Sequence, residues 1–525
     1  MNTFATFLTA EQVQRIHEAS LEILEQVGLL VRNEKARRRF AHHGCPVDNE
    51  TLSVRLPRAI VEEFIKLIPP TFKFYARDPK YDRVLPDDGP LVATASSAPN
   101  IVDPAAGYER RARSDDIARA AHLVMELEGI DVFSVSTLAG DAPPGQFSLS
   151  RFYPALKNCA KPVRTSVIDP REGEQILKLG ALIAGSEAAY LERPFITFGH
   201  CAIVPPLTMD FDSTEMLMFF AERGLPHYGT VVPNAGLTSP LTLTGTLAQG
   251  NAELLAQSML TQMSRPGTPM IYQTLPTVGD MRTGAYSPGA IETGMLLMGF
   301  AQMARFYNVP CGGYVGLTNA KISDAQAGYE RGMSGVAALL GGLDYFVMGG
   351  LMDALMSLDF GQLVIDNEIA LMLKRVARGL EFGEENLALD LIAEAGPGGM
   401  FIDKTHTLER MKQTAFLPEI ADRDPRGKWE EKGRRTSHDR AMLKVRDILT
   451  RDNPAMFSPE VDARIRAEFA GLVAGEAVPP DGWQRVAPPR GHSRGAERRQ
   501  RETSPPAPSP GHESAVVRRG ERAEI

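Results

Sequence analysis

The chain has 525 residues, of which 43% are hydrophobic and 23% are charged, and its formal net charge at pH 7 is -8. This composition supplies ample material for a globular core and excludes a collagen-like chain, a coiled coil and a wholly disordered chain. The negative net charge argues against nucleic acid or an anionic membrane surface as the partner of the whole molecule.

The four cysteines, Cys45, Cys159, Cys201 and Cys311, are far apart in the sequence and form no C-x-x-C pair. Reduced thiols in the cytoplasm fit this spacing better than a disulfide scaffold or a zinc ribbon. The N-terminus has no basic stretch before an apolar core, so no signal peptide is expected. The most apolar stretch, 335–352, contains Asp344 and several glycines, so we expect a buried helix and strand there and not a membrane span.

Residues 1–90 are predicted to form an N-terminal helical region. Thr9 and Gln12 fit a capping box, in front of apolar residues at helical spacing. A second helix is expected over 57–67, closed by Pro69 and Pro70.

Residues 91–380 alternate between short β-rich runs and helical segments. Strands are expected at 91–96, 131–137, 162–168, 194–200, 226–232, 269–275, 310–316 and 344–350. Helices are expected at 114–129, 147–158, 171–185, 211–223, 245–264, 288–307, 322–341 and 360–379. This alternation predicts parallel βαβ units and an α/β fold of the (β/α)8 TIM barrel type. The alternative, a doubly wound open sheet, usually has a Gly-rich turn after its first strand, and this chain has SSAPNIVDP there.

The chain after the barrel divides into two further regions. Residues 381–475 are predicted to be helical, with a stop signal at Gly396-Pro397. Residues 476–525 are rich in Pro, Arg, Gly and Ser, so we expect a disordered tail. The arginines at 494–501 could contact an acidic partner or simply be solvated.

In a barrel, chemistry is expected where the strands end at their carboxyl side. The residues predicted at those ends include hydroxyls, amides and aromatics but few carboxylates. Phe198, Tyr272 and Tyr314 fall near the ends of three strands and could surround a quaternary ammonium, or could simply pack. His200 and Cys201 are neighbours on a strand and face opposite sides, so no metal site is predicted. No G-x-S-x-G, Walker loop or H-E-x-x-H occurs, and no catalytic residue is singled out.

Several long stretches over about residues 1–450 resemble the trimethylamine methyltransferase superfamily. They are LTAEQVQRIHEASLEILEQVGL (8–29), PGTPMIYQTLPTVGDMRTGAYSPGAIE (266–292), NAKISDAQAGYERG (319–332), QLVIDNEIALMLKRVARGLEF (362–382), ALDLIAEAGPGGMFIDKTHT (388–407) and LPEIADRDPRGKWEEKGRR (417–435). The resemblance implies a barrel enzyme that moves a methyl group from a methylated amine to the Co(I) corrinoid of a separate protein. The sequence contains only the twenty standard residues, so it is similar to the branch without pyrrolysine, which includes glycine betaine methyltransferases.

The resemblance makes a small quaternary amine, glycine betaine or a similar compound, the expected substrate. The side chains expected to bind it are Phe198, His200, Asn234, Tyr272, Gln273 and Tyr314, with Arg164 as a further donor for a carboxylate. No D-x-H-x-x-G corrinoid signature occurs, so no tightly bound cofactor is expected and the corrinoid is supplied by a cognate partner protein. We also expect a homo-oligomer. The alternatives are a non-catalytic betaine-binding barrel and a trimethylamine-type enzyme acting on a different methylated amine.

Overall fold

A computed structural model describes residues 5–167 and 169–479. The described residues up to Arg423 and from Arg435 onward belong to one compact unit. Asp424–Arg434, which contains α16 (Arg426–Glu431), belongs to a second unit. The tail predicted at 476–525 lies outside the described residues from 480 onward.

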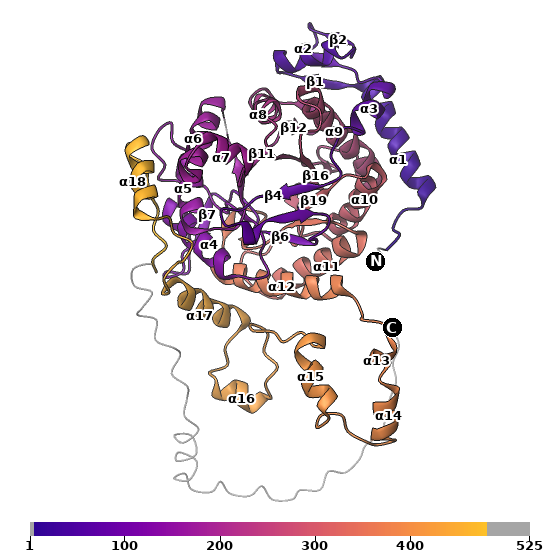
Figure 1. The fold of residues 1–525 in the computed structure, drawn as a ribbon. Helices are drawn as coiled ribbons and strands as arrows, with labels where there is room; N and C mark the ends of the chain where they lie inside the picture. Colours follow the sequence, from indigo (N-terminus) through magenta and orange to yellow (C-terminus); the bar gives the residue numbers. More distant parts are fainter. Residues whose placement is uncertain (1–4, 168, 480–525) are drawn as a thin grey trace, which may run out of the picture. The chain divides into compact units, whose positions relative to one another are not determined.

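Eight parallel strands form a barrel at the centre of the larger unit (Figure 1). In chain order these are β6 (Leu91–Ala93), β9 (Phe133–Ser134), β10 (Val163–Ser166), β11 (Ile196–His200), β14 (His227–Val231), β16 (Met270–Thr274), β19 (Cys311–Tyr314) and β20 (Tyr345–Val347). The sheet runs continuously from β6 through β20 to β9, and a parallel bridge between Ala93 and Val132 joins its two edges. The predicted (β/α)8 barrel is therefore confirmed, with strands shorter than the sequence suggested.

Each barrel strand is followed by a helix that returns the chain to the opposite end. The eight helices are α4 (Ser114–Glu126), α5 (Leu149–Asn158), α6 (Pro170–Ala184), α8 (Phe211–Glu222), α9 (Leu243–Ser264), α10 (Ile291–Tyr307), α11 (Ala325–Gly341) and α12 (Phe360–Arg378). Local signals set their ends: Asp169 caps α6 in front of Pro170, and Gly185 ends it in the left-handed conformation that glycine adopts without strain. A short extra helix, α7 (Glu187–Glu192), precedes β11.

The N-terminal region covers the outer side of α9, which is buried from Thr246 to Met263. It contains α1 (Ala10–Glu22) with the predicted Thr9–Gln12 capping box, a short π-helical turn η1 (Ile23–Val27), α2 (Glu34–His42) and α3 (Arg58–Ile65). The prediction that this region is helical throughout is wrong, because it also supplies strands. They are β1 (Leu29–Val31), β2 (Val47–Asp48), β3 (Ser53–Val54), β4 (Phe72–Phe74) and β5 (Arg83–Leu85). β1 pairs with β13 (Thr208–Met209), far away in the sequence, and β13 pairs with β12 (Ile203–Val204).

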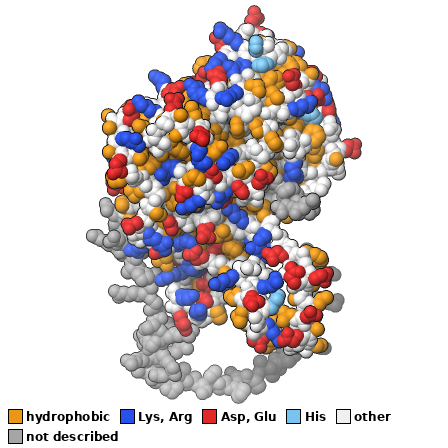
Figure 2. Space-filling model, in the orientation of Figure 1, with side chains coloured by type: hydrophobic (Ala, Val, Ile, Leu, Met, Phe, Trp, Pro, Cys, Tyr) orange, Lys and Arg blue, Asp and Glu red, His pale blue; other side chains and the backbone are white. Residues whose placement is uncertain are grey.

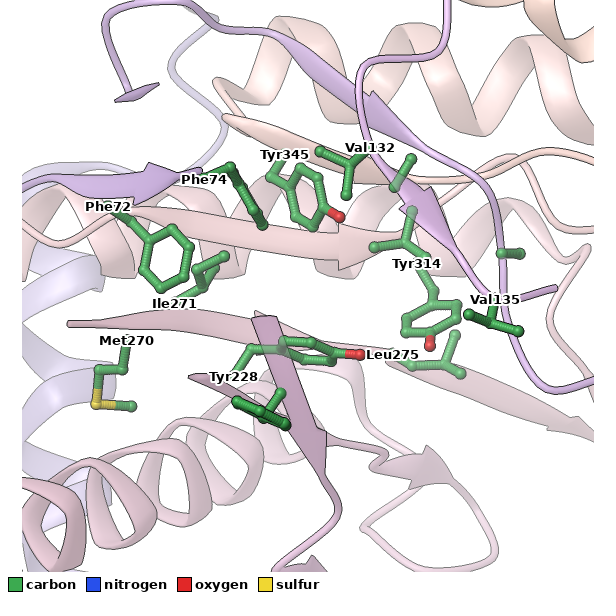
Figure 3. Close-up of a cluster of buried hydrophobic side chains, with 14 of the residues drawn as sticks. Phe72, Phe74, Val132, Val135, Tyr228, Met270, Ile271, Leu275, Tyr314 and Tyr345 are labelled. Atoms are coloured by element: carbon green, nitrogen blue, oxygen red, sulfur yellow. The ribbon is translucent and has the colours of Figure 1, made fainter. Parts of the chain in front are cut away.

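The hairpin of β4 and β5 fills one end of the barrel interior. Phe72 and Phe74 are fully buried, and the Phe74 ring lies 5.1 Å from that of Tyr345, centroid to centroid. Figure 3 shows both phenylalanines beside Tyr345 and Ile271, at the opposite side of the cluster from Tyr314 and Leu275. The candidate site lies at the opposite end of the barrel, where the strands finish.

Short strands in the loops surround that carboxyl end. β7 (Asn100–Val102), β8 (Glu109–Arg111), β21 (Leu351–Met352) and β22 (Ser357–Leu358) form one small sheet. β15 (Asn234–Ala235), β17 (Thr277–Asp280) and β18 (Ala285–Ser287) form another. A short 3-10 turn, η2 (Pro79–Tyr81), lies between β4 and β5.

Helices follow the barrel, as predicted for residues 381–475. They are α13 (Glu384–Leu387), α14 (Leu389–Ala395), α15 (Thr405–Thr414), α17 (Ser437–Leu449) and α18 (Pro459–Glu468). Gly396 ends α14 at the predicted stop signal. α13, α14 and α15 contain no buried residue. We call residues 380–417 the arm.

On the face of the molecule that Figure 2 shows, acidic and basic side chains are interspersed.

Candidate active site at the carboxyl end of the barrel

A layer of polar and aromatic side chains crosses the barrel interior. Arg164 of β10 donates from Nε to Ser134 Oγ at 3.0 Å and from Nη1 to Gln273 Oε1 at 3.0 Å. Its guanidinium carbon lies 3.9 Å from the ring centroid of Tyr228 and 5.1 Å from that of Tyr345. These contacts come from five strands and show which face of each strand looks inward.

Gln273, a predicted substrate ligand, belongs to this interior layer. Its Oε1 accepts from Arg164, and its Nε2 donates to Thr230 Oγ1 at 2.7 Å. Both ends of the amide therefore have protein partners. The arrangement fits a positioning residue for Arg164 better than a direct ligand of the substrate.

Tyr314 of β19 points inward, as expected, toward the carboxyl end of the barrel. Its hydroxyl lies 3.0 Å from Ser96 Oγ, and Figure 3 shows its ring beside Leu275 and Val135. Tyr228 of β14 also points into the barrel interior. A Cβ added at Gly199 would lie 2.4 Å from the Tyr228 hydroxyl, so glycine at that position leaves room for the ring. Tyr314 is the aromatic side chain best placed to face a bound ligand, because the Tyr228 ring already has the Arg164 guanidinium 3.9 Å from its centroid.

Phe198 does not face this space, and the prediction that it does is wrong. Its ring stacks on Phe220 of α8 at 4.3 Å with an interplanar angle of 14°, and lies 6.2 Å from Phe152 of α5. The side chain therefore packs between the barrel wall and the surrounding helices.

His200 lies on the same side of β11 as Phe198, as the two-residue spacing predicts, and so the expectation that it reaches a substrate carboxylate is also wrong. Its ring is 5.4 Å from that of His227, which is bound by Leu225 O and Thr261 Oγ1 of α9. Burial, and then His227, hold the pKa of His200 well below its usual value. His200 is therefore an uncharged side chain of the helix-facing layer.

Tyr272 likewise points away from the barrel interior, in contrast to the prediction. Its hydroxyl donates to Asn251 Oδ1 of α9 at 2.7 Å. Asn251 Nδ2 in turn donates to Ser20 Oγ of α1 and to Tyr307 of α10. This network ties the barrel wall to the N-terminal region and leaves Tyr272 no part in the site.

Asn234 begins β15, directly after the carboxyl end of β14. Its side chain is buried, and its Oδ1 has no hydrogen-bond partner among the described residues. It is retained as a candidate ligand on a loop at the correct end of the barrel.

Arg151, which the sequence analysis did not single out, lies at the same end with Ser97. Arg151 of α5 donates from Nη2 to Ser97 Oγ at 2.9 Å and also to Thr165 Oγ1. Ser97 has a φ of 74°, a left-handed conformation that is uncommon for serine. Its neighbour Ser96 is the partner of Tyr314, so these two consecutive serines contact a ring and a guanidinium.

The part of the chain that the structure describes contains no group of three or more His, Cys, Asp or Glu that could hold a metal ion. Among its helices, none is long and apolar enough to cross a membrane. The four cysteines form no disulfide.

Comparison with known families identifies the group to which this barrel belongs. The model of the trimethylamine methyltransferase family, MTTB, matches residues 2–474. The chain belongs to the trimethylamine methyltransferase family. The resemblance drawn from the sequence motifs is therefore confirmed over nearly the whole described part of the chain.

Individual relatives show how the chain compares within the family. A glycine betaine methyltransferase of Desulfitobacterium hafniense (strain Y51) is 33% identical over 88% of this chain and 96% of its own. A trimethylamine methyltransferase MttB of Desulfitobacterium hafniense (strain DSM 10664 / DCB-2) is 29% identical over 87% of this chain and 92% of its own. The trimethylamine methyltransferase MttB of Methanosarcina thermophila is 30% identical over 84% of this chain and 92% of its own. Among solved structures, the monomethylamine methyltransferase MtmB of Methanosarcina barkeri has a TM-score of 0.45 and 13% identity, over 83% of this chain and 92% of its own.

Proposed function

We propose that this protein is an enzyme that transfers a methyl group from a small quaternary amine, glycine betaine or a similar compound, to the Co(I) corrinoid of a separate protein. The observation that carries the proposal is the 33% identity to a glycine betaine methyltransferase along 88% of the chain. The site supports it, because Tyr314 presents a ring at the end of the barrel where barrel enzymes bind substrates.

The reaction asks little acid–base chemistry of the protein. The corrinoid of the partner supplies the nucleophile, the methyl carbon–nitrogen bond breaks, and its electron pair stays on nitrogen. The amine therefore leaves neutral and needs no proton. The barrel has to hold the ammonium in line with the acceptor and keep water away, through positioning and desolvation.

The aromatic side chains provide the recognition of the positive charge. A cation over the face of a tyrosine ring is attracted by about 0.5–2 kcal/mol, more when water is excluded. Tyr314 is only 8% exposed, so its ring is largely withdrawn from bulk water. The hydrogen bond between Tyr314 and Ser96 fixes the orientation of this ring.

The proposal is tested with the purified protein and a cognate corrinoid protein reduced to Co(I). Glycine betaine, carnitine, proline betaine and trimethylamine are offered separately, and the cobalt absorbance is followed. We expect methylation of the corrinoid by at least one quaternary amine and little methylation by trimethylamine. Methylation with trimethylamine alone would favour the trimethylamine-type alternative. Binding of a betaine without turnover would favour the non-catalytic barrel.

We also propose that the protein acts in the cytoplasm as a homo-oligomer. Its four unpaired cysteines fit a reducing compartment. The arm supports self-association, because large hydrophobic side chains are exposed along it. They are Leu380, Phe382, Leu387, Leu389, Ile392, Met400, Phe401, Ile402, Leu408, Met411 and Leu417. Together they form an exposed apolar surface of the kind that a standard interface, roughly 800 Å² per partner, would bury.

A second apolar surface on the same chain could receive the arm of another copy. This surface lies along the outer side of α11, where four large side chains follow helical spacing and are each at least 40% exposed. They are Tyr329, Met333, Val336 and Leu340.

Light scattering of the full chain should show a multiple of the 57.3 kDa monomer. The double variant Phe382→Ser/Ile402→Ser should lower the mass, whereas Glu384→Ser/Lys412→Ser on the same arm should not. A monomeric parent chain at micromolar concentration would contradict this proposal.

A further inference from the structure

Arg151 is a buried cation at the carboxyl end of the barrel, and no described carboxylate is in direct contact with it. Its side chain is 1% exposed, and it makes no ion pair with any described residue. The acceptors of its Nη atoms are neutral oxygens of Ser97, Thr165 and Ser166, the last at 3.4 Å, and its Nε is buried without a partner. Arginines are rarely this buried unless paired with an acid, because a lone charge loses its hydration.

One carboxylate acts on Arg151 from a distance, but none of the described carboxylates contacts it. Glu172 acts on it through space, but this carboxylate is bound by the backbone N–H and the hydroxyl of Ser148. Arg164, on β10, is a second fully buried arginine without an ion pair among the described residues, and its Nη2 lacks a partner. Burial lowers the pKa of Arg151 to about 10, which still leaves it charged at neutral pH.

Two of the residues that contact Arg151 are more accessible than the arginine itself. Ser97 and Ser166 are half-buried, in contrast to the arginine behind them. Ser97 is held in its left-handed conformation with its hydroxyl on Arg151, while Ser96 contacts the hydroxyl of Tyr314. The Arg151 guanidinium and the Tyr314 ring are thereby held by two consecutive residues just after the end of β6.

We propose that Arg151, with Ser97 and Ser166, binds a carboxylate of the substrate while Tyr314 faces its ammonium group. This inference rests on the proposed function and narrows its substrate class to zwitterionic amines that carry a carboxylate, as betaines do. The carboxylate supplies a counter-charge in direct contact with the guanidinium, and the two serine hydroxyls can turn to donate to it. Hydrogen bonds between a guanidinium and a carboxylate are stronger than those to neutral oxygens, so the exchange favours binding.

The test compares ligands that differ only in the carboxylate. Glycine betaine and tetramethylammonium are titrated by calorimetry into the parent chain and into Arg151→Gln, Arg151→Lys and Ser97→Ala. Arg151→Gln should weaken glycine betaine by about 10- to 100-fold, the range for removing a charged hydrogen-bond donor, and tetramethylammonium by less than about twofold. Arg151→Lys should lose part of this affinity, because lysine keeps the charge but not the forked geometry.

Controls separate this inference from loss of fold and from the proposed function. Arg193→Gln removes an arginine that is paired with Asp82 and should leave both affinities unchanged. If Arg151→Gln does not fold, Ser97→Ala still tests the site, since it should weaken glycine betaine selectively. Equal effects on both ligands, or none in any variant, would overturn the inference. Methylation by the parent from tetramethylammonium as efficiently as from glycine betaine would overturn it while preserving the proposed function, whereas no methylation from any quaternary amine would reject the proposed function.

Discussion

The ring of Phe198 lies parallel to that of Phe220, with 4.3 Å between the centroids. This contact joins the barrel wall to α8 and makes Phe198 a packing residue. The Phe198→Ala variant should therefore destabilise the protein by about 3–5 kcal/mol through the cavity it leaves. The KM for the amine should stay unchanged in the folded enzyme.

Chemical denaturation of the Phe198→Ala variant, together with its steady-state kinetics, checks this expectation. Phe211→Ala changes an exposed phenylalanine at the start of the same helix and should alter the free energy of unfolding by less than about 0.5 kcal/mol. A large rise in KM with normal stability would return Phe198 to the binding site.

Tyr314 should show the opposite behaviour. The Tyr314→Leu variant loses an aromatic face, so the KM for quaternary amines should rise by about 2- to 30-fold, with or without a carboxylate on the substrate. Tyr314→Phe keeps the ring and loses only the contact with Ser96, so its KM should change less. Equal KM values for the parent and the leucine variant would place the ammonium elsewhere.

Glu253 should make stability fall as the pH rises. Burial raises the pKa of this carboxyl to about 7, while Oε1 accepts from Leu207 N and from Gln249 Nε2. The folded state therefore holds a proton that the unfolded state releases between about pH 4.5 and 7, and stability is lost across that window.

The Glu253→Gln variant keeps an acceptor and removes this titration. It should match the parent near pH 5 and exceed it by about 2–3 kcal/mol at pH 8, measured by urea denaturation. A constant difference in the free energy of unfolding from pH 5 to pH 8 would contradict the assignment.

His438 of α17 should give a weaker pH dependence of the same sign. Its Nε2 lies 2.9 Å from Asp359 Oδ1, and this hydrogen bond raises the pKa of the histidine. The stabilisation is fully present below about pH 6.5 and is lost as the pH rises through the higher folded-state pKa. Because the side chain is 32% exposed, we expect less than about 1 kcal/mol.

Melting temperatures of the parent and of His438→Gln, recorded from pH 5.5 to 8.5, test this pair. The difference between the two proteins should shrink as the pH rises. His42→Gln alters an exposed histidine of α2 and serves as the control substitution. A parent advantage that grows with pH would exclude a protonated His438.

The barrel could be predicted from the sequence because its signals are local. Eight β-rich runs alternate with helical segments, and all eight expected strands form the barrel. Caps such as Thr9 with Gln12, and stops such as Gly396, depend only on residues within one turn. The long motifs likewise identified the family along nearly the whole described part of the chain.

The N-terminal strands were missed because their partners are remote. Leu30 pairs with Thr208, and nothing within the short segment around Leu30 indicates that neighbour. Such short strands are stabilised by the tertiary contact and not by their own sequence.

The sequence by itself determined the order of strands and helices, the barrel they form and the family to which the chain belongs. Only the tertiary structure decided which face of each strand looks inward. β11, β14 and β16 are buried on both faces, so the apolar–polar alternation that would reveal the inward face is absent. The prediction assigned the wrong residues of β11 and β16 to the inward face. It therefore placed Phe198, His200 and Tyr272 in the site, whereas the structure places them against the surrounding helices. Arg151 could not be found in this way, because it lies on a helix and reaches the strand ends only through the fold of the βαβ unit.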